Sequence, residues 1–456
     1  MKLNKLAASL AVAVAAAVVM APAAPQAAEL PEATKKILAK LKLDASILKG
    51  LDKEMNPPKA WIDGAKKEGR VKIGGTWDPD QFRKMAAPFV ERYPFVKITY
   101  NRATRMDRVN KPLMAFRAGR YLTDVISGIG AQFPLFKELN AIVDLRVLPN
   151  WGNVPDGMKH PEGLWVGQRL RYWCLSYNTK LVKKSELPKT WDALVDDPRW
   201  HNQKIGLGNR PNLWLVMLWG IKGSEWGGNY INKMFAVTKP QLRKEGMNAM
   251  IGLAIAGEFE IALPSAAYRV IQMVDKGAPI GWHCPEPVPL AVSELAVMRG
   301  NPHMNASLLF VDWFMSKEGQ IAQYAANKAP PVHRELQTQN FLAFPDQILG
   351  KKIAFRSPEL MERTMVKVFK VWDPAWQRGL GISYKTVKVK ITKTKRKGRR
   401  ISFKVGGKTH TVKVSGSRTQ VLINGQDNDR SNIKVGMTCM VTYPGNKEEA
   451  RKFSCK

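Results

Sequence analysis

An alternation of strand and helix patterns most constrains the fold of this chain. Residues 71–75 predict a strand that ends in glycines, and apolar positions within residues 82–93 recur at the spacing of one helix face. A second strand pattern follows at residues 96–100, a helix pattern at 111–118 and a third strand pattern at 124–128. This order predicts a parallel sheet covered by helices. Ligands of such sheets bind beyond the carboxyl ends of the strands.

The chain is long enough to form more than one domain. It has 456 residues, whereas a single hydrophobic core seldom grows beyond about 250–300 residues. A second α/β pattern begins near Tyr177, with strand patterns at residues 204–207 and 261–263 and a helix pattern at 213–219. Residues 279–289 are irregular and rich in proline, as expected of a crossover between domains.

Residues 1–28 carry the pattern of a secretory signal peptide. Lys2 and Lys5 give a positive start, an apolar run follows at residues 6–20, and small residues lead to a cleavage site within positions 23–28. The alternative is a membrane helix, which needs about 20 apolar residues, and this run is shorter. The pattern therefore predicts export, with the mature chain in the periplasm.

Charge distinguishes the last part of the chain. The formal net charge is +34, and residues 384–456 hold 19 Lys and Arg against 4 Asp and Glu. The basic run at residues 393–400 could neutralise phosphates, but few aromatic side chains accompany it for base stacking. We therefore expect no nucleic acid. An anionic envelope surface, such as lipid head groups or acidic glycans, is the expected partner, and a merely solvated hairpin is the alternative.

From Tyr384 onward the sequence predicts a separate β module. Valine and isoleucine alternate with lysine, and glycine pairs or Asn-Gly mark tight turns at residues 406–407 and 424–425. This pattern is typical of a small antiparallel sheet or barrel over residues 384–456. A core this small benefits from a cross-link.

The four cysteines form two candidate pairs. Cys439 and Cys455 lie 16 positions apart within the β module, and in an oxidising compartment we expect a disulfide between them. Cys174 and Cys284 could form a second bridge or remain two buried thiols. Neither pair has the spacing of a metal site.

Six segments of the body carry a family resemblance through their order and spacing rather than through any single one. They lie at residues 177–182, 188–194, 197–200, 276–280, 300–306 and 314–320, and together they cover most of residues 70–330. These segments resemble extracellular solute-binding proteins of ABC transporters. More narrowly, they are similar to the branch that includes ferric-iron-binding proteins and phosphonate- or thiamine-type binders.

The resemblance implies a two-lobed α/β body with the type II periplasmic-binding-protein fold, to which the small all-β module is added. After a helical preface at residues 29–60, this body spans residues 61–383. The first lobe would hold residues of about 61–175 and 285–383, and the second lobe those of about 176–284. The resemblance further implies that the protein binds a small-molecule solute between its lobes and signals to an inner-membrane ABC permease. We also expect a monomer without a cofactor.

The same resemblance places ligand-binding loops at defined positions. Exposed N–H groups at helix N-termini favour anions, and arginine offers a bidentate fork for a carboxylate or phosphate. We therefore expect a small, anionic solute. The candidate residues are Thr76, Trp77, Arg102, Ser127, Gly128, Arg210, Asn212 and Tyr268.

Most of these residues also have a structural interpretation. Thr76, Ser127 and Asn212 could serve as helix caps or in turns. The arginines could be solvated surface charges, and Trp77 could pack in the core.

A pair of arginines near the middle of the chain adds another candidate. Arg169 and Arg171 are separated by one residue, so on a strand their side chains share a face. Tyr172 and Trp173 follow directly. This segment could line the ligand site or form a solvated edge strand.

Ferric iron is an alternative ligand. Iron-binding relatives place tyrosines close to the position of Tyr268, but its neighbours here are Ala266 and Ala267, which cannot coordinate a metal. The six histidines are scattered and form no pair at ligand spacing. We therefore expect no metal site and prefer a small organic or phosphate-like anion.

Enzymatic function has little support in the sequence. We find no phosphate-binding P-loop, no His-Glu-x-x-His pair and no Gly-x-Ser-x-Gly elbow. Glu258 and Glu260 are more typical of a surface turn than of a catalytic dyad. We therefore expect a binding protein rather than an enzyme. The alternative function is an envelope-associated scaffold or adhesion protein that acts through the basic β module.

Overall fold

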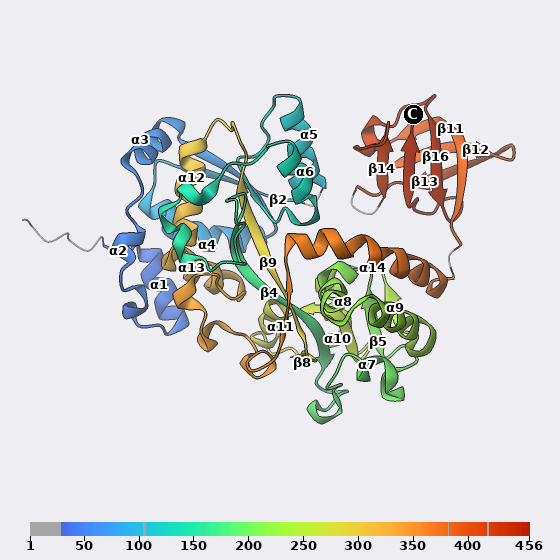
Figure 1. Cartoon of the computed structure of the whole chain (residues 1–456), viewed down its shortest axis with the longest axis horizontal. Helices are drawn as coiled ribbons and strands as arrows, with labels where there is room; N and C mark the ends of the chain where they lie inside the picture. Colours follow the sequence, from blue (N-terminus) through green and yellow to red (C-terminus); the bar gives the residue numbers. More distant parts are fainter. Residues whose placement is uncertain (1–28, 104–105, 382, 417–418) are drawn as a thin grey trace, which may run out of the picture.

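The computed structural model describes residues 29–456 apart from residues 104–105, 382 and 417–418 (Figure 1). The proposed signal peptide, residues 1–28, lies outside the described residues. The described chain forms a two-lobed α/β body followed by a separate β module (Figure 1). Within this part, no helix is both long enough and apolar enough to cross a membrane.

The first lobe is built on the alternating strands and helices that the sequence predicts. β1 (Arg70–Gly75) lies between β2 (Lys97–Arg102) and β3 (Val125–Ser127) and is parallel to both. Helices α4 (Pro79–Arg92) and α5 (Lys111–Arg117) connect these strands. The carboxyl ends of all three strands therefore meet at one edge of the sheet.

Two long strands run through both lobes and join them. β4 (Val166–Asn178) pairs with β9 (Val288–Val297) along its first half and with β7 (Ile261–Ala266) and β8 (Ile280–His283) along its second half. β9 is antiparallel to β3, and the strand order is β2-β1-β3-β9-β4-β7-β5-β6. Because both lobes share β4 and β9, bending of these strands would change the angle between the lobes.

The second lobe extends the same sheet beyond β4. β5 (Ile205–Gly208) lies between β6 (Gln241–Arg243) and β7 and is parallel to both. The helices of this lobe are α8 (Leu215–Lys222), α9 (Ser224–Lys233), α10 (Met247–Ile255) and α11 (Ala267–Val274). α11 begins directly after β7, so its first residues lie at the carboxyl end of a sheet strand.

The helix α14 (Pro358–Gly379) packs against α8 and α9 of the second lobe. Its Trp372 is 1 % exposed, lies edge-on to the ring of Trp214 and donates its Nε1–H to Asn209 Oδ1 at 2.8 Å. The sequence-based division placed residues up to 383 in the first lobe. The contacts of α14 instead attach this helix to the second lobe, because its apolar face covers the tryptophans there.

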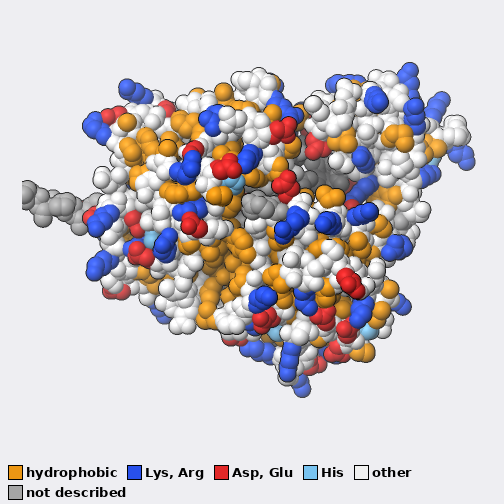
Figure 2. Space-filling view, viewed as in Figure 1, with side chains coloured by type: hydrophobic (Ala, Val, Ile, Leu, Met, Phe, Trp, Pro, Cys, Tyr) orange, Lys and Arg blue, Asp and Glu red, His pale blue; other side chains and the backbone are white. Residues whose placement is uncertain are grey.

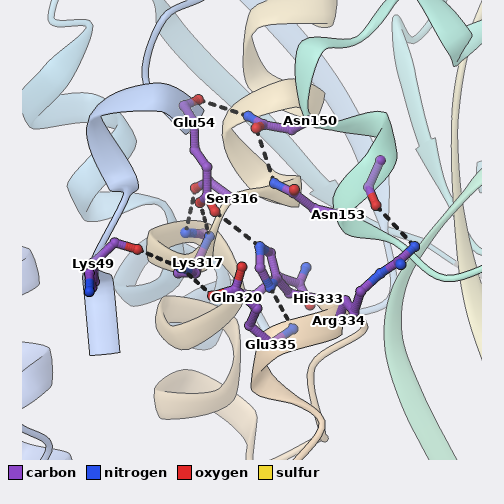
Figure 3. Close-up of polar contacts among 12 residues, drawn as sticks. Lys49, Glu54, Asn150, Asn153, Ser316, Lys317, Gln320, His333, Arg334 and Glu335 are labelled. Carbon is purple, nitrogen blue, oxygen red and sulfur yellow. Dashed lines mark hydrogen bonds and ion pairs between the residues drawn. The ribbon is translucent and has the colours of Figure 1, made fainter. Parts of the chain in front are cut away.

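The N-terminal helices are fastened to the first lobe by a buried polar cluster (Figure 3). Glu54, at the end of α2 (Leu51–Glu54), accepts the backbone N–H of Lys317 at 2.7 Å, and its Oε1 lies 3.1 Å from His333 Nε2. The Nζ of Lys317, the first residue of α13 (Lys317–Asn327), donates to the carbonyl oxygen of Lys49 at 2.6 Å. These bonds make the preface an integral part of this lobe.

A buried carboxyl beside this cluster predicts a pH-dependent stability. Asp312, on α12 (Met304–Met315), is 2 % exposed and accepts the backbone N–H of Asn150 at 2.9 Å. Burial, together with the charge of Glu54, raises the pKa of Asp312 to about 7. A folded-state pKa above the unfolded value means that the folded protein binds the proton more tightly, so stability falls as pH rises between the two values.

We expect the Asp312 carboxyl to lower the free energy of unfolding by up to about 1.4 kcal/mol per pH unit as pH rises from about 4 to about 7. Urea unfolding of the wild type and of Asp312→Asn, followed across this range, measures the difference in slope. Parallel pH profiles for the two proteins would contradict the assignment.

The β module forms the seven-stranded sheet β13-β12-β11-β16-β17-β14-β15. The predicted alternation is confirmed, with one parallel pair, β14 and β17, among antiparallel neighbours. Its strands are β11 (Lys385–Lys395), β12 (Arg400–Val405), β13 (Lys408–Lys413), β14 (Gln420–Ile423), β15 (Gln426–Asp427), β16 (Thr438–Tyr443) and β17 (Lys452–Cys455).

Both cysteine pairs are disulfide-bonded. Cys439 and Cys455 are register partners on β16 and β17 and join these strands in the core of the module. Cys174 and Cys284, whose pairing the sequence left open, join β4 to the residue that follows β8. The second bridge therefore lies in the body, within the strands that continue into the second lobe.

Candidate functional site

A buried arginine lies at the junction of the two lobes. Arg169, on β4, is 3 % exposed, and its Nη2 donates to Thr76 Oγ1 at 3.0 Å. Its guanidinium carbon lies 5.0 Å from the ring centroid of Trp77 and 5.7 Å from that of Tyr268. Thr76 follows β1 of the first lobe, whereas Tyr268 lies in the first turn of α11 in the second lobe. One side chain on the shared strand therefore contacts both lobes.

The charge of Arg169 is poorly compensated by the protein. Among the residues that the structure describes, no carboxylate lies within ion-pair distance of its guanidinium, and its Nε has no hydrogen-bond partner. Burial, with repulsion from Arg171, lowers the pKa of Arg169 to about 10, so the group remains a cation at neutral pH. An uncompensated buried charge costs several kcal/mol. A bound anion would remove much of this cost.

Two further arginines extend this positive charge along the junction. Arg171 follows two residues later on β4, and its guanidinium lies 5.6 Å from the ring of Trp173. Arg356 ends β10 (Ile353–Arg356). Both are register partners of Ala291 on β9, so they share one face of the sheet. We call Arg169, Arg171 and Arg356 the arginine row.

The arginine row faces little negative charge. Arg356 has 8 % of its side chain exposed, and its Nη2 lies 3.6 Å from Glu294 Oε1. Burial lowers the pKa of Arg356 to about 10, and Arg171 adds to this effect. Among the described residues, Glu294 is the one carboxylate within ion-pair distance of a guanidinium of the row, so the row carries a net positive charge. Such a row attracts and orients a small anion.

One end of the junction is held together by an ion-pair bridge. Asp78 Oδ1 lies 2.8 Å from Arg102 Nη1, and its Oδ2 lies 2.6 Å from Nη2 of Arg269 on α11. Beside this bridge, Gln81 Nε2 donates to Gln272 Oε1 at 3.4 Å. These contacts link the first lobe to the second. They also show that the guanidinium of Arg102 is already paired with a carboxylate.

The structure brings Thr76, Trp77 and Tyr268 together around Arg169 and places the other candidates elsewhere. Trp77 is 1 % exposed and contacts Phe82 and Phe314, so it belongs to the core of the first lobe. Ser127 is fully buried and accepts a hydrogen bond from Gln168 at 2.8 Å.

The remaining candidates lie in turns. Gly128 has a φ of +80°, and its carbonyl oxygen accepts a hydrogen bond from Arg108. Arg210 and Asn212 lie at the short helix η8 (Pro211–Leu213), exposed and half-buried respectively. The role of Gly128 is therefore conformational, because its backbone lies in the left-handed region that glycine adopts most easily.

The sequence offered a signal for the burial of Arg169 and the partial burial of Arg171. Apolar residues occupy both alternating positions of β4, as expected of a strand that is covered on both faces. An edge strand with one solvated face would instead alternate strictly. The solvated-edge interpretation of these two arginines is therefore wrong, since β4 is a central strand of the sheet.

The donor groups of the junction can bind an anion. In the part of the chain that the structure describes, no group of three or more His, Cys, Asp and Glu side chains could hold a metal. Arginine is a donor of hydrogen bonds and cannot coordinate a cation. The residues gathered here can bind carboxylate, phosphate or sulfonate oxygens.

Sequence comparison identifies relatives of the body. A family model described as bacterial extracellular solute-binding protein matches residues 123–347. Iron uptake protein A2 of Synechocystis sp. is 24% identical over 215 residues, which cover 43% of this chain and 61% of that protein. Iron uptake protein A1 of the same organism is 24% identical over 198 residues, covering 40% and 53%. The matched part thus spans a little over half of these curated relatives.

Solved structures share the fold of the body. An extracellular solute-binding protein from Bordetella parapertussis superposes with a TM-score of 0.55 at 17% identity, covering 68% of this chain and 99% of that one. The Trichodesmium protein IdiA (FutA), solved with iron and citrate, gives 0.55 at 17% identity, covering 67% and 99%. Apo FutA2 from Synechocystis gives 0.54 at 18%, covering 68% and 99%. With its strands β4 and β9 shared between two lobes, the body has the type II fold of periplasmic binding proteins, and residues 123–347 match the family model of bacterial extracellular solute-binding proteins.

Proposed function

We propose that the protein captures a small anion between its two lobes in the periplasm and delivers it to an ABC permease of the inner membrane. The observation that carries this proposal is the burial of Arg169 between Thr76 and Tyr268 without a carboxylate partner in the described chain. An anion at this point would contact both lobes at once. Its binding energy would therefore favour the closed arrangement over an open one.

The hydrogen-bond donors of the arginine row indicate the chemical class of the anion. The arginine row supplies planar, bidentate donors that fit carboxylates and phosphates. The relatives are named for iron uptake, and the Trichodesmium structure contains iron together with citrate. A ferric ion held within an anionic chelate is therefore the second candidate, since the arginines could bind the chelator rather than the metal.

The protein would act as a monomeric carrier without turnover. A solute-binding protein returns its ligand unchanged, so one mole of protein should bind one mole of anion and release no product. The export pattern of residues 1–28 and the resemblance to transporter components support a periplasmic location and a permease as the partner.

A thermal-shift screen of ligand-stripped protein tests this function. The panel contains phosphate, a phosphonate, a sulfonate, thiamine phosphate, citrate, 4-hydroxybenzoate, ferric citrate and ferric chloride. A ligand at 100 times its dissociation constant stabilises the folded state by about 2.7 kcal/mol, so a specific anion should raise the melting temperature clearly. A shift with ferric citrate but not with citrate would establish the chelate. A shift with ferric chloride alone, or with none of the compounds, would contradict the proposal.

The β module would hold the binding protein near an anionic envelope surface. Lys395, Arg400 and Lys413 are exposed register partners on β11, β12 and β13, so three like charges stand side by side. Like charges directly opposite each other are destabilising. No carboxylate of the described chain forms an ion pair with these three residues. Figure 2 shows Lys and Arg side chains gathered over this module.

We expect the protein without residues 1–28 to bind vesicles of phosphatidylglycerol and phosphatidylcholine but not vesicles of phosphatidylcholine alone. Exchange of Lys395, Arg400 and Lys413 for glutamate should weaken this binding at least about tenfold, because each basic residue near an anionic surface contributes about 1 kcal/mol. Co-sedimentation measures the bound fraction. Glutamate at Lys97, Lys189 and Lys244, three exposed lysines of the body, is the matched control. Equal losses in the two variants would contradict a specific role of the module.

A further inference from the structure

A cavity of about 200 Å³ lies between the first lobe and α14, next to the end of the arginine row. Its first-lobe wall comes from the segment around α6 (Phe133–Glu138), and α14 faces α6 across the junction in Figure 1. Most of its lining is apolar. The lining residues used below are Phe133, Trp165, Glu294, Arg356, Met361 and Met365.

Three polar groups in this apolar wall lack adequate partners. Trp165 is 4 % exposed, and its Nε1–H has no hydrogen-bond acceptor among the described residues. The Oε2 of Glu294 is likewise buried without a donor in the described chain. Within the same part of the chain, the guanidinium of Arg356 makes only long contacts, at 3.5 Å to the carbonyl oxygen of Val292 and at 3.6 Å to Glu294. Buried polar groups are nearly always hydrogen-bonded, and leaving one unpaired costs about 1–3 kcal/mol.

The size and lining of the cavity fit one aromatic ring. A cavity of about 150 Å³ lined by apolar side chains is known to accept benzene. Here Phe133 offers an aromatic neighbour, and Met361 and Met365 offer the polarizable sulfurs that pack well against rings. A small inorganic anion, which has no apolar part, would make no favourable contact with these apolar side chains.

The buried polar groups without adequate partners indicate which polar substituents the aromatic ligand carries. The Trp165 N–H needs an acceptor and Glu294 Oε2 needs a donor, and a hydroxyl group is both. Arg356, at the end of the arginine row, needs an anion. A ligand that carries a hydroxyl at one side of a ring and a carboxylate at the other satisfies all three groups.

We propose that this cavity receives the ring of a hydroxylated aromatic carboxylate, whose carboxylate lies on the arginine row and whose hydroxyl binds Trp165 and Glu294. This inference rests on the proposed function and names the class of its solute. Because α14 packs on the second lobe, the ring contacts both lobes, and its burial adds to the closing effect of the carboxylate.

Calorimetric titration of ligand-stripped, full-length protein tests the inference. The probes are acetate, benzoate, the three monohydroxybenzoates, citrate and phosphate. We expect benzoate to bind at least tenfold more tightly than acetate, and one hydroxybenzoate to bind at least tenfold more tightly than benzoate. Trp165→Phe keeps the aromatic ring but removes the N–H, so it should abolish the advantage of the hydroxyl while leaving the affinity for benzoate within about threefold.

A second variant tests the cavity itself. Met361→Trp fills the space, so the aromatic acids should fall to the affinity of acetate, whereas Lys370→Trp, an exposed position on the same helix, should leave them unchanged. If citrate or phosphate binds through Arg169 but no aromatic acid binds more tightly than acetate, the inference is overturned and the proposed function stands. If none of these anions binds, both fail.

Discussion

Replacement of Arg169 by methionine should lower the affinity for the bound anion at least about 100-fold, since removing one member of a buried charge pair costs roughly 2–5 kcal/mol. The same change should raise the stability of the ligand-free protein, because it replaces a buried cation without a carboxylate partner in the described chain by an apolar side chain of similar length. Calorimetry with citrate and 4-hydroxybenzoate measures the first effect, and urea unfolding measures the second.

A lower affinity for the anion together with a higher stability of the ligand-free protein would distinguish a ligand-binding arginine from a structural one. A structural role for Arg169 would make the variant less stable and would impair binding only through the fold. Arg102→Ala is the control, because Arg102 is half-exposed and its guanidinium already pairs with Asp78. We expect it to change the affinity by less than about threefold. Equal losses in the two variants would contradict the assignment of the site to the arginine row.

Replacement of Arg92 by alanine should destabilise the protein by about 3–5 kcal/mol, because it leaves the fully buried carboxylate of Glu318 without its counter-ion. Arg92 donates two hydrogen bonds to Glu318, at 2.6 and 2.9 Å. Thr34 of α1 (Glu32–Leu41) donates a third bond at 2.6 Å, and Trp313 a fourth at 2.9 Å. One carboxylate thus ties α1, α4 and α12 to α13, and urea unfolding reports its loss.

An exposed ion pair on the same helix is the control for this prediction. Arg83 and Asp80 lie 2.9 Å apart with 77% of each side chain exposed, so Arg83→Ala should change the stability by no more than about 0.5 kcal/mol. In the double variant Arg92→Met/Glu318→Gln no charge is left buried, and most of the stability should return. A loss of less than about 1 kcal/mol for Arg92→Ala would show that Glu318 is compensated by its neutral donors alone.

The spacing of apolar residues along short segments predicted several helices and strands correctly. The parallel strands β1, β2 and β3 followed from short apolar runs that end in glycines or polar residues, and α4 followed from its apolar face. The β module followed from strict alternation of valine and lysine along β11. In each case the period of the sequence matches the geometry of one element.

Features set by partners distant in the sequence could not be predicted in this way. Arg169 is buried because β4 is enclosed by β9 and β7, which lie more than 80 positions further along the chain. The amphipathic pattern of α14 indicates that one face is covered, but not that the covering residues belong to the second lobe. Thr76 and Tyr268 were identified from their places at the ends of strands, whereas the arginine between them required the assembled sheet.

Closure of the lobes around an anion is the central claim, and a distance between the lobes tests it directly. Nitroxide labels at Arg120→Cys in the first lobe and Lys244→Cys in the second lobe occupy exposed positions, and both native cysteine pairs are bonded. Double electron–electron resonance on ligand-stripped protein gives the distance distribution before and after addition of phosphate, citrate, ferric citrate or 4-hydroxybenzoate. We expect at least one of these anions to shorten and narrow the distribution in the labelled protein and to have no effect when Arg169 is replaced by methionine. An identical distribution with every anion would contradict the claim that the protein captures an anion between its lobes.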